Sequence, residues 1–558
     1  MKPVRNLKSL IINHWPLIII IFLGAFFRFY NLNWDQGHFF HPDERNIAAA
    51  VSQIHFFGQL DPKFFAYGSF PIYLIRSVGD SIGFLTNNSR WVYDWERINL
   101  ISRGISALLS SLTIILVFLV GQKIWEKKVG LIASFLTAFT VSLIQTAHYG
   151  VTESMLVFWL LLLLIFSFEI IEKPTIKNYA KTGIILGLAT ATKISALSFL
   201  IIPVSVHLLY HFSTRGGSAP GGKYLKYHFR FLFSILVALF TFSFFSPYVF
   251  LDKQKFLESL NYEIGVALGR LKVVYVLQFE KTLPYLFQIK NFFWQMGPVA
   301  LFGILGTILL LVIALKTRDK KLLILLSFPV AYFVYVGSWY TKFIRFMVPV
   351  LPFLAIFAAW FLFEVWKKSK IFGGILLTLT LTLTLSWSLA FLSIYTRQST
   401  RITASSWIYQ NIPKGSKILG EHWDDGLPIE LSLNHPSLYK IEQLTIYEPD
   451  NQQKIEYYAE KLSGSDYIII NSRRLYGTLI YLPEKYPITS RYYQLLFSGK
   501  LGYTKIAEFS SYPSLLGFTI NDDSSEETFQ VYDHPKVIIF KNGGRFSPQT
   551  LKNILSYD

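Results

Sequence analysis

The stretch ESMLVFWLLLLLIFSF, residues 153–168, decides the fold class of this chain. It begins with one carboxylate and continues as an apolar run, and with its flanks it reaches the roughly 20 residues that cross a bilayer as a helix. A second run of this kind is SSLTIILVFLV at 110–120. Of the 558 residues 52% are hydrophobic and only 16% are charged, whereas about a quarter are charged in soluble domains. The chain is therefore predicted to be a polytopic α-helical membrane protein.

Hydropathy predicts about eleven transmembrane helices. The run at 180–212 is long and carries Lys193 in its middle. We expect two helices there, the first unusually short, that meet at Thr192–Lys193, because a broken helix is tolerated where it lines a cavity. A single pass would reduce the count to ten. The expected spans lie near residues 11–31, 98–121, 128–146, 152–171, 180–212, 230–251, 291–315, 321–338, 342–365 and 371–395.

The positive charge of the chain is placed mainly in short loops. The formal net charge is +18, and six short segments hold 20 of the 53 Lys and Arg residues. Such loops are typical of the cytoplasmic side, so the charge indicates membrane topology and not a nucleic-acid partner. We expect a multi-pass protein of the plasma membrane with its N-terminus in the cytoplasm and its outer loops at 32–97 and 252–290. The absence of cysteine excludes disulfides and thiolate chemistry.

The C-terminal part differs in composition from the rest. Segments such as NQQKIEYYAEKL, DYIIINS and KVIIFKN alternate helical and strand patterns. We therefore expect a transmembrane catalytic domain at 1–395 and an extracytoplasmic α/β domain at 396–558, and the latter is expected to cover the site or to contact the acceptor.

Charged residues gather at the outer ends of the expected helices. Charges at membrane depth are costly and usually mark a pathway or a site. Simpler explanations also apply, because Pro42-Asp43-Glu44 and Glu153 suit helix starts and basic residues serve as interfacial anchors. Lys193 is harder to explain in that way, because it interrupts an apolar run. The candidates are Asp43, Glu44, Glu153, Lys193, Lys342 and Arg345.

Four segments, taken in order, resemble the GT-C glycosyltransferases that use a lipid-phosphate sugar donor, a group that includes protein O-mannosyltransferases (glycosyltransferase family 39) and lipid A aminoarabinose transferases. The resemblance runs from about residue 15 to 365. One departure is FAYGSFPIYL, which has Tyr-Gly-Ser where many members carry a His-Pro-Pro-like step. The segments are FFRFYNLNWDQGHFFHPDER, YGVTESMLVFW, GLATATKISAL and KFIRFMVPVLPFLAIF.

The resemblance implies a reaction and roles for the residues. A sugar, hexose or pentose, moves with inversion from a polyprenyl phosphate to a hydroxyl of a protein, lipid or glycan at the outer face. Asp43 is the expected general base and Glu44 its catalytic neighbour. Donor phosphate is expected to bind Lys193, Arg345 and Lys342, and the substrate-positioning residues are Glu153, Arg45, Tyr67 and His148.

Two alternatives remain open at the level of sequence. A transporter or flippase of lipid-linked sugars would also have broken helices and intramembrane charges, although the hydropathy shows no two-half symmetry. A divalent cation could be held by Asp43, Glu44 and Glu153, but these acids lack the large, closely grouped ligand set that such ions usually have. The sequence therefore favours a metal-independent site.

Overall fold

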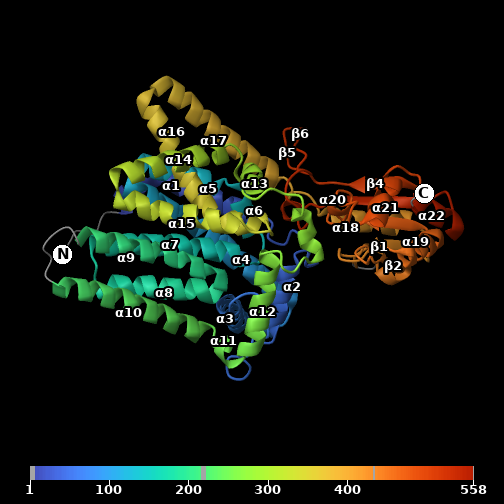
Figure 1. Ribbon diagram of the computed structural model, residues 1–558, viewed down its shortest axis with the longest axis horizontal. Coiled ribbons are helices and arrows are strands. Elements are labelled where there is room, and N and C mark those ends of the chain that lie inside the picture. The colour runs from blue at the N-terminus through green and yellow to red at the C-terminus, as the bar shows by residue number, and fades with distance from the viewer. Residues whose placement is uncertain (1–6, 215–220, 432–433, 557–558) are drawn as a thin grey trace. The chain divides into compact units, whose positions relative to one another are not determined.

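The computed structural model describes residues 7–214, 221–431 and 434–556 (Figure 1). Residues 1–6 and 215–220, which belong to two of the basic segments, lie outside the described residues. The chain divides into two compact units. The first comprises Met1–Leu32, His41–Arg270 and Leu283–Leu389, and the second comprises Asn33–Phe40, Leu271–Thr282 and Ala390–Asp558.

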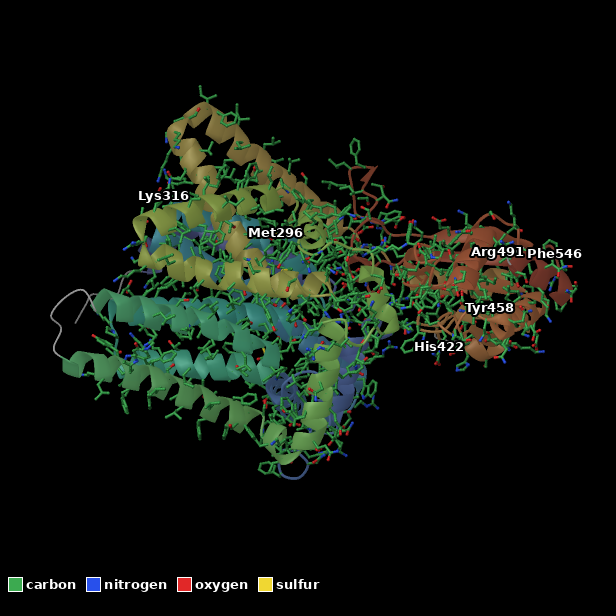
Figure 2. All side chains as sticks on the ribbon, viewed as in Figure 1. Met296, Lys316, His422, Tyr458, Arg491 and Phe546 are labelled. Carbon is green, nitrogen blue, oxygen red and sulfur yellow. The ribbon has the colours of Figure 1, made fainter. Side chains whose placement is uncertain are left out.

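The first unit is entirely helical over the residues that the structure describes. Its most buried candidate span is α16, which packs against α14 and α5, and Met296 lies in the same apolar core (Figure 2). The helices are α1 (Leu7–Phe29), α2 (Pro42–Ser52), α3 (Ser69–Thr86), α4 (Trp95–Ile124), α5 (Lys127–Ala138), α6 (Val141–Ala147), α7 (Glu153–Glu172), α8 (Ile176–Thr192), α9 (Ile201–Thr214), α10 (Gly221–Phe245), α11 (Tyr248–Leu251), α12 (Lys253–Ala267), α13 (Leu286–Met296), α14 (Val299–Thr317), α15 (Lys320–Gly337), α16 (Leu351–Lys368) and α17 (Lys370–Leu392), which ends in the second unit.

The expected count of eleven spans is not confirmed. Within the described ranges, seven helices are long and apolar enough to cross a membrane, or eight if the bent pair α5–α6 is one span. The expected span at 128–146 is this pair, which bends by 57°. The expected spans at 11–31 and 180–212 correspond to helices whose described apolar parts are too short to qualify, among them His14–Phe29 and Ile194–Leu209. The protein is thus a polytopic helical membrane protein with seven or eight candidate spans among the described residues.

The break at Lys193 is confirmed. Helix α8 ends at Thr192, Lys193 is extended with φ −159° and ψ 133°, and a 3-10 helix at Ile194–Leu200 leads into α9. Figure 1 shows α8 and α9 alongside α7 and α10. Helix α8 packs very closely on α10, because a Cβ added at Gly187 would lie 2.6 Å from the carbonyl oxygen of Ala238. Small residues are what allow helix backbones in membranes to approach this closely.

The second unit confirms the expected mixture of helices and strands after residue 396. Its five-stranded sheet has the order β2-β1-β3-β7-β4, in which β1 is parallel to β2 and β3 while β7 is antiparallel to β3 and β4. Tyr458 lies in its core (Figure 2). The elements are α18 (Thr400–Asn411), β1 (Lys417–Glu421), β2 (Lys440–Leu444), α19 (Gln452–Gly464), β3 (Tyr467–Ile470), α20 (Tyr476–Leu479), α21 (Pro487–Phe497), β4 (Tyr503–Phe509), β5 (Ser514–Leu515), β6 (Phe518–Thr519), β7 (Val537–Asn542) and α22 (Pro548–Leu555).

Candidate active site

Asp43 lies in the first turn of α2, where the local sequence favours a helix start. Pro42 begins the helix, and the ring of the preceding His41 accepts a hydrogen bond from the backbone N–H of Asp43 at 3.3 Å. Proline at the first position and acids in the first turn suit the positive end of a helix dipole. The same geometry directs the Asp43 carboxylate out of the helix start, towards residues far away in the sequence.

The Asp43 carboxylate is held on one side by two partners. Its Oδ2 accepts a hydrogen bond from the Tyr67 hydroxyl at 2.7 Å and pairs with Arg345 Nη1 at 2.5 Å. The Asp43 side chain is 22% exposed and that of Arg345 is 28% exposed. Among the described residues none bonds to Oδ1. The structure therefore joins a carboxylate with one free oxygen to a cation that comes from the 3-10 helix Ile344–Val350.

Electrostatics keep the Asp43 carboxylate ionised. Burial on its own raises the pKa of Asp43, but the charges of Arg345 and His41 and the hydrogen bonds from Tyr67 and Arg345 together hold this pKa well below its usual range. The phenol of Tyr67 has the opposite shift, since burial and the negative charge of Asp43 raise its pKa. Tyr67 therefore remains a hydrogen-bond donor to an ionised acid.

A second ion pair lies beside the first. Lys193 Nζ is 3.6 Å from Glu153 Oε1 and lies 4.8 Å from the centre of the Tyr67 ring. Glu153 begins α7 and is buried, and among the described residues its Oε2 has no hydrogen-bond partner. Tyr67 thus touches both pairs, through its hydroxyl on Asp43 and through its ring on Lys193. Two cations and two carboxylates converge here.

The loop that carries Tyr67 is fastened to the broken helix by main-chain contacts. The N–H of Gly68 donates to the carbonyl oxygen of Thr192 at 3.0 Å. A Cβ at position 68 would lie 1.9 Å from the carbonyl oxygen of Ala191, so only glycine fits. This contact gives the Tyr-Gly-Ser step a physical reason, because the glycine lets the loop reach the end of α8.

Glu44 faces a different environment from its neighbour Asp43. Its carboxylate pairs with Arg103 at 2.7 Å, with both side chains 0% exposed, and Oε1 also accepts from the backbone N–H of Gly150 at 2.6 Å. Arg103 in turn donates to the carbonyl oxygen of Leu32. Glu44 therefore ties α2 to α4 and to the loop before α7. Sequence reasoning missed Arg103, although a charge inside an apolar run, the signal that identified Lys193, is present there too.

The remaining expected site residues have more local contacts. Lys342 is buried, with its ammonium on the carbonyl oxygen of Tyr340 at 2.8 Å. His148 is fully buried, with one ring nitrogen 2.8 Å from the carbonyl oxygen of Ile144 and the other 2.8 Å from that of Tyr30. Arg45 follows Glu44 on α2 and is partly exposed. Both of these His148 contacts are to backbone, and the ammonium of Lys342 also lies 5.6 Å from the centre of the Tyr340 ring.

One further acid belongs to the electrostatic environment of the cluster. Burial raises the pKa of Glu263 on α12, while the positive charges of Lys193 and Arg345 act to lower it and the charge of Asp43 acts to raise it. Glu263 lies in the expected outer loop 252–290, and its short polar context NYE gave no sign of a site. Glu263 is thus a third carboxylate whose ionisation the two cations influence.

The acids do not gather as a metal site. Asp43 and Glu44 each bind an arginine. Over the described part of the chain, no three His, Asp or Glu side chains are grouped so that they could hold a metal ion.

Comparison with a family model identifies the chemistry. Residues 67–257, about a third of the chain, match the family described as Dolichyl-phosphate-mannose-protein mannosyltransferase. Over these residues the chain is similar to this family, and it is a glycosyltransferase. The match includes Tyr67, Glu153 and Lys193 of the cluster, while Asp43 and Arg345 lie on either side of it. The enzyme uses a polyprenyl-phosphate sugar as donor. Among curated proteins none matches its sequence.

Solved structures show that the enzyme has the GT-C fold. The oligosaccharyltransferase of Archaeoglobus fulgidus, in a crystal structure with Zn and sulfate, superposes with a TM-score of 0.54 at 14% identity, over 89% of this chain and 72% of that one. Its form tethered to an acceptor peptide with the NVT sequon gives 0.50 at 14% identity, over 96% and 89%. ArnT from Cupriavidus metallidurans bound to undecaprenyl phosphate gives 0.48 at 14% identity, over 96% and 100%.

Proposed function

We propose that the enzyme transfers the sugar with inversion to a hydroxyl acceptor at the outer face of the membrane. The observation that supports this most directly is the geometry of Asp43, whose Oδ2 is held by Tyr67 and Arg345 while Oδ1 is left without a described partner. A general base must reach the proton that it removes, and an ionised carboxylate with one free oxygen meets that need.

The reaction then proceeds in one displacement. The acceptor oxygen attacks the anomeric carbon from the face opposite the phosphate, and Asp43 Oδ1 takes the hydroxyl proton. The bond between the anomeric carbon and the phosphate oxygen breaks, and the polyprenyl phosphate leaves with the electron pair. The leaving group is already an acidic phosphate, so no general acid is needed, and Lys193 and Arg345 stabilise the negative charge that develops on it.

Donor binding also activates the base in this proposal. Arg345 binds phosphate oxygens well because its guanidinium offers paired donors. In the structure described above the same guanidinium neutralises Asp43. When a donor phosphate binds the guanidinium of Arg345, less of its positive charge acts on Asp43. The pKa of Asp43 then rises, and Asp43 becomes a stronger base. The proton acceptor is therefore weak until the donor is present.

The other candidates have supporting roles in this proposal. Glu44 was expected to act in catalysis, but its buried pair with Arg103 supports a positioning role, in which it holds the start of α2 in place. Glu153 orients Lys193, and its unpaired Oε2 suits a sugar hydroxyl. Lys342 adds positive charge near the donor phosphate. His148 and Arg45 position the helix ends around the sugar.

The membrane arrangement is part of the same proposal. We place residues 1–395 as the catalytic transmembrane domain, with the N-terminus in the cytoplasm, and residues 396–558 outside the cell in a plasma membrane. The polyprenyl tail requires a lipid-facing groove, whereas the sugar and the acceptor require water, and an interfacial site supplies both. The acceptor hydroxyl belongs to a protein, lipid or glycan of the cell envelope.

The test is sugar transfer by the purified enzyme from a radiolabelled polyprenyl-phosphate hexose or pentose to native membrane extract. We expect Asp43→Asn to lose transfer by about 10²- to 10⁴-fold, the usual contribution of a general base, while donor binding is retained. Lys193→Ala should weaken donor binding. Asp80→Asn is the matched control, because the Asp80 side chain is 41% exposed and pairs with Arg76 of the same helix, α3, outside the Asp43 cluster.

Two results would contradict the proposal. Full transfer by Asp43→Asn would remove Asp43 as the base. A product whose anomeric configuration equals that of the donor, read by NMR of the released glycan, would exclude a single displacement.

A further inference from the structure

The second unit carries an apolar hairpin tip that is exposed to solvent. Strands β5 and β6 form a two-stranded hairpin in which Ser514 pairs with Thr519 and Leu515 pairs with Phe518. The side chain of Leu516 is 91% exposed and that of Phe518 is 80% exposed, and Ile520, just after the hairpin, is 38% exposed. Single exposed apolar residues are ordinary, but a contiguous exposed apolar group usually marks an interaction surface.

The turn itself does not account for leucine at its tip. Leu516 and Gly517 form a two-residue loop with φ 51° and 85°, both in the left-handed region. Turns of this kind favour Asn-Gly or Gly-Gly, because most side chains are strained at positive φ. A leucine at the first position is thus unfavourable for the backbone and is also fully exposed to solvent. Strain kept in an exposed position suggests that the side chain has a function outside the fold.

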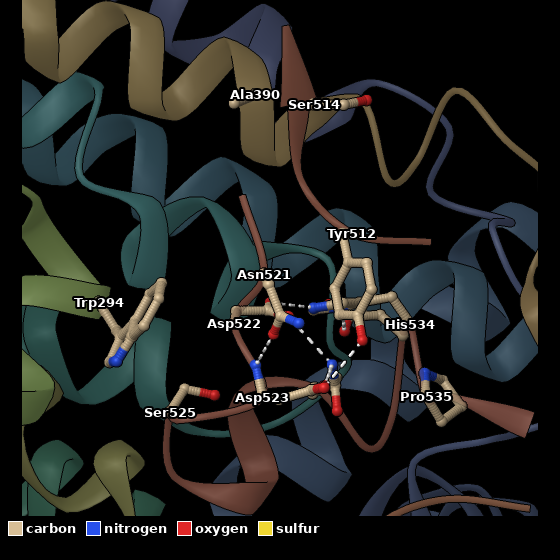
Figure 3. Close-up of polar contacts among 12 residues, drawn as sticks. Trp294, Ala390, Tyr512, Ser514, Asn521, Asp522, Asp523, Ser525, His534 and Pro535 are labelled. Atoms are coloured by element: carbon tan, nitrogen blue, oxygen red, sulfur yellow. Dashed lines mark hydrogen bonds and ion pairs between the residues drawn. The ribbon is translucent and has the colours of Figure 1, made fainter. Parts of the chain in front are cut away.

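The base of the hairpin is anchored beside the end of a membrane span. Helix α17 is one of the candidate spans and ends at Leu392. The very next residue, Ser393, accepts a hydrogen bond from the N–H of Ser514 at 3.1 Å. Arg397, one turn further, donates to the carbonyl oxygen of Tyr512 at 2.7 Å. Figure 3 shows Ser514 close to Ala390 in the last turn of the span.

The flanks of the hairpin are also fixed, so the tip has a defined height relative to the end of α17. The Tyr512 hydroxyl and the Lys536 ammonium both donate to Asp523 Oδ2, at 2.9 and 2.6 Å. Asp522 Oδ2 lies 2.7 Å from the buried His534 ring (Figure 3). These contacts secure the segments before and after the hairpin to the segment that leads into β7.

We propose that the tip of the β5–β6 hairpin, Leu516 and Phe518, inserts into the interfacial layer of the bilayer leaflet in which α17 ends. The residue that follows the membrane span is hydrogen-bonded to the base of the hairpin, which keeps the apolar tip close to the end of that span. Arg397, at the base, suits the phosphate of a lipid headgroup. Apolar side chains above a basic residue are the usual composition of an interfacial anchor.

The experiment exploits the absence of cysteine from the chain. A single Leu516→Cys variant of the full enzyme, labelled with an environment-sensitive fluorophore, is reconstituted into nanodiscs with one enzyme each. We expect blue-shifted emission and strong quenching by lipids that carry a nitroxide at a shallow acyl position, with weaker quenching by a deep nitroxide. Gln549→Cys, exposed on α22 within the same unit, is the matched control and should remain unquenched.

Two results would overturn the proposal. One is a Leu516→Cys label as unquenched and as water-exposed as the control. The other is energy transfer between labelled enzymes in vesicles without quenching by lipid, which would show that the tip binds a second copy of the chain. Leu516→Asn gives an independent check, because asparagine suits the turn. The folded state should be retained or stabilised in detergent, while a fluorophore placed at Phe518→Cys in this variant should lose lipid quenching.

Discussion

The coupling of donor binding to the basicity of Asp43 predicts two different acid limbs in the pH dependence of transfer. The pH profile of kcat/KM reports the free enzyme, and that of kcat reports the enzyme with donor bound. In the free enzyme Arg345 pairs with Asp43 at 2.5 Å and holds its pKa well below the usual range. With donor bound, part of the guanidinium charge is directed to phosphate, so the pKa of Asp43 rises.

The size of the difference follows from the geometry. For charge centres about 4 Å apart at an effective dielectric constant near 20, the attraction is about 4 kcal/mol. This corresponds to about three pKa units. Both side chains are about a quarter exposed, so water screens part of this energy. We therefore expect the acid limb of kcat to lie about two pKa units above that of kcat/KM, with activity lost as the pH falls and Asp43 is protonated.

The assay measures initial transfer rates at saturating and at limiting donor, from pH 9 down to the lowest pH at which the melting temperature shows that the enzyme is still folded. In Arg345→Gln the two limbs should coincide, both at higher pH than in the wild type, because burial alone raises the pKa of Asp43. Coincident limbs in the wild type would refute the idea that the donor releases the base.

Three further predictions concern stability and positioning. Arg103→Met leaves the buried Glu44 carboxylate without its cation and should destabilise the protein by about 3–5 kcal/mol. The readout is a lower melting temperature, which the added Glu44→Gln change should restore. A normal melting temperature with lost transfer would instead indicate that Arg103 acts directly in catalysis. Gly68→Ala should abolish donor binding because its Cβ would strike a backbone carbonyl, whereas Gly58→Ala, whose Cβ has no neighbour within 3.7 Å, should bind normally. Burial by itself lowers the pKa of His534, but two aspartates raise this pKa to about 10. The stabilisation that His534 provides is therefore complete below about pH 6.5 and is lost as the pH rises through 10. A pH-independent free energy of unfolding over this range, or the same pH profile in His534→Gln, would contradict this prediction.

Sequence patterns anticipated some parts of this structure for clear physical reasons. Lys193 marks the helix break because a charge in an apolar run needs a polar destination, and the structure shows the break there. The expected count of eleven spans is not confirmed, because hydropathy measures composition and does not detect the bend of 57° between α5 and α6. It also cannot tell a full crossing from a short helix such as α8.

The site itself could be predicted only in outline. The pairing of Asp43 with Tyr67 and Arg345 joins residues 24 and 302 positions apart, and no local pattern specifies such contacts. Glu44 was grouped with Asp43 because they are adjacent in sequence. On a helix, however, neighbours point about 100° apart, and here one faces Arg345 while the other faces Arg103. Adjacency in sequence is therefore a poor guide to shared chemistry.

The bond between Gly68 and Thr192 has a consequence for engineering. Because it joins main chain to main chain, the side chains before it can be exchanged without moving the loop. A library that varies residues 64–66 while Tyr67 and Gly68 stay fixed would change the side chains beside the cluster on an unchanged frame. Altered sugar preference could then be selected without first having to rescue the fold.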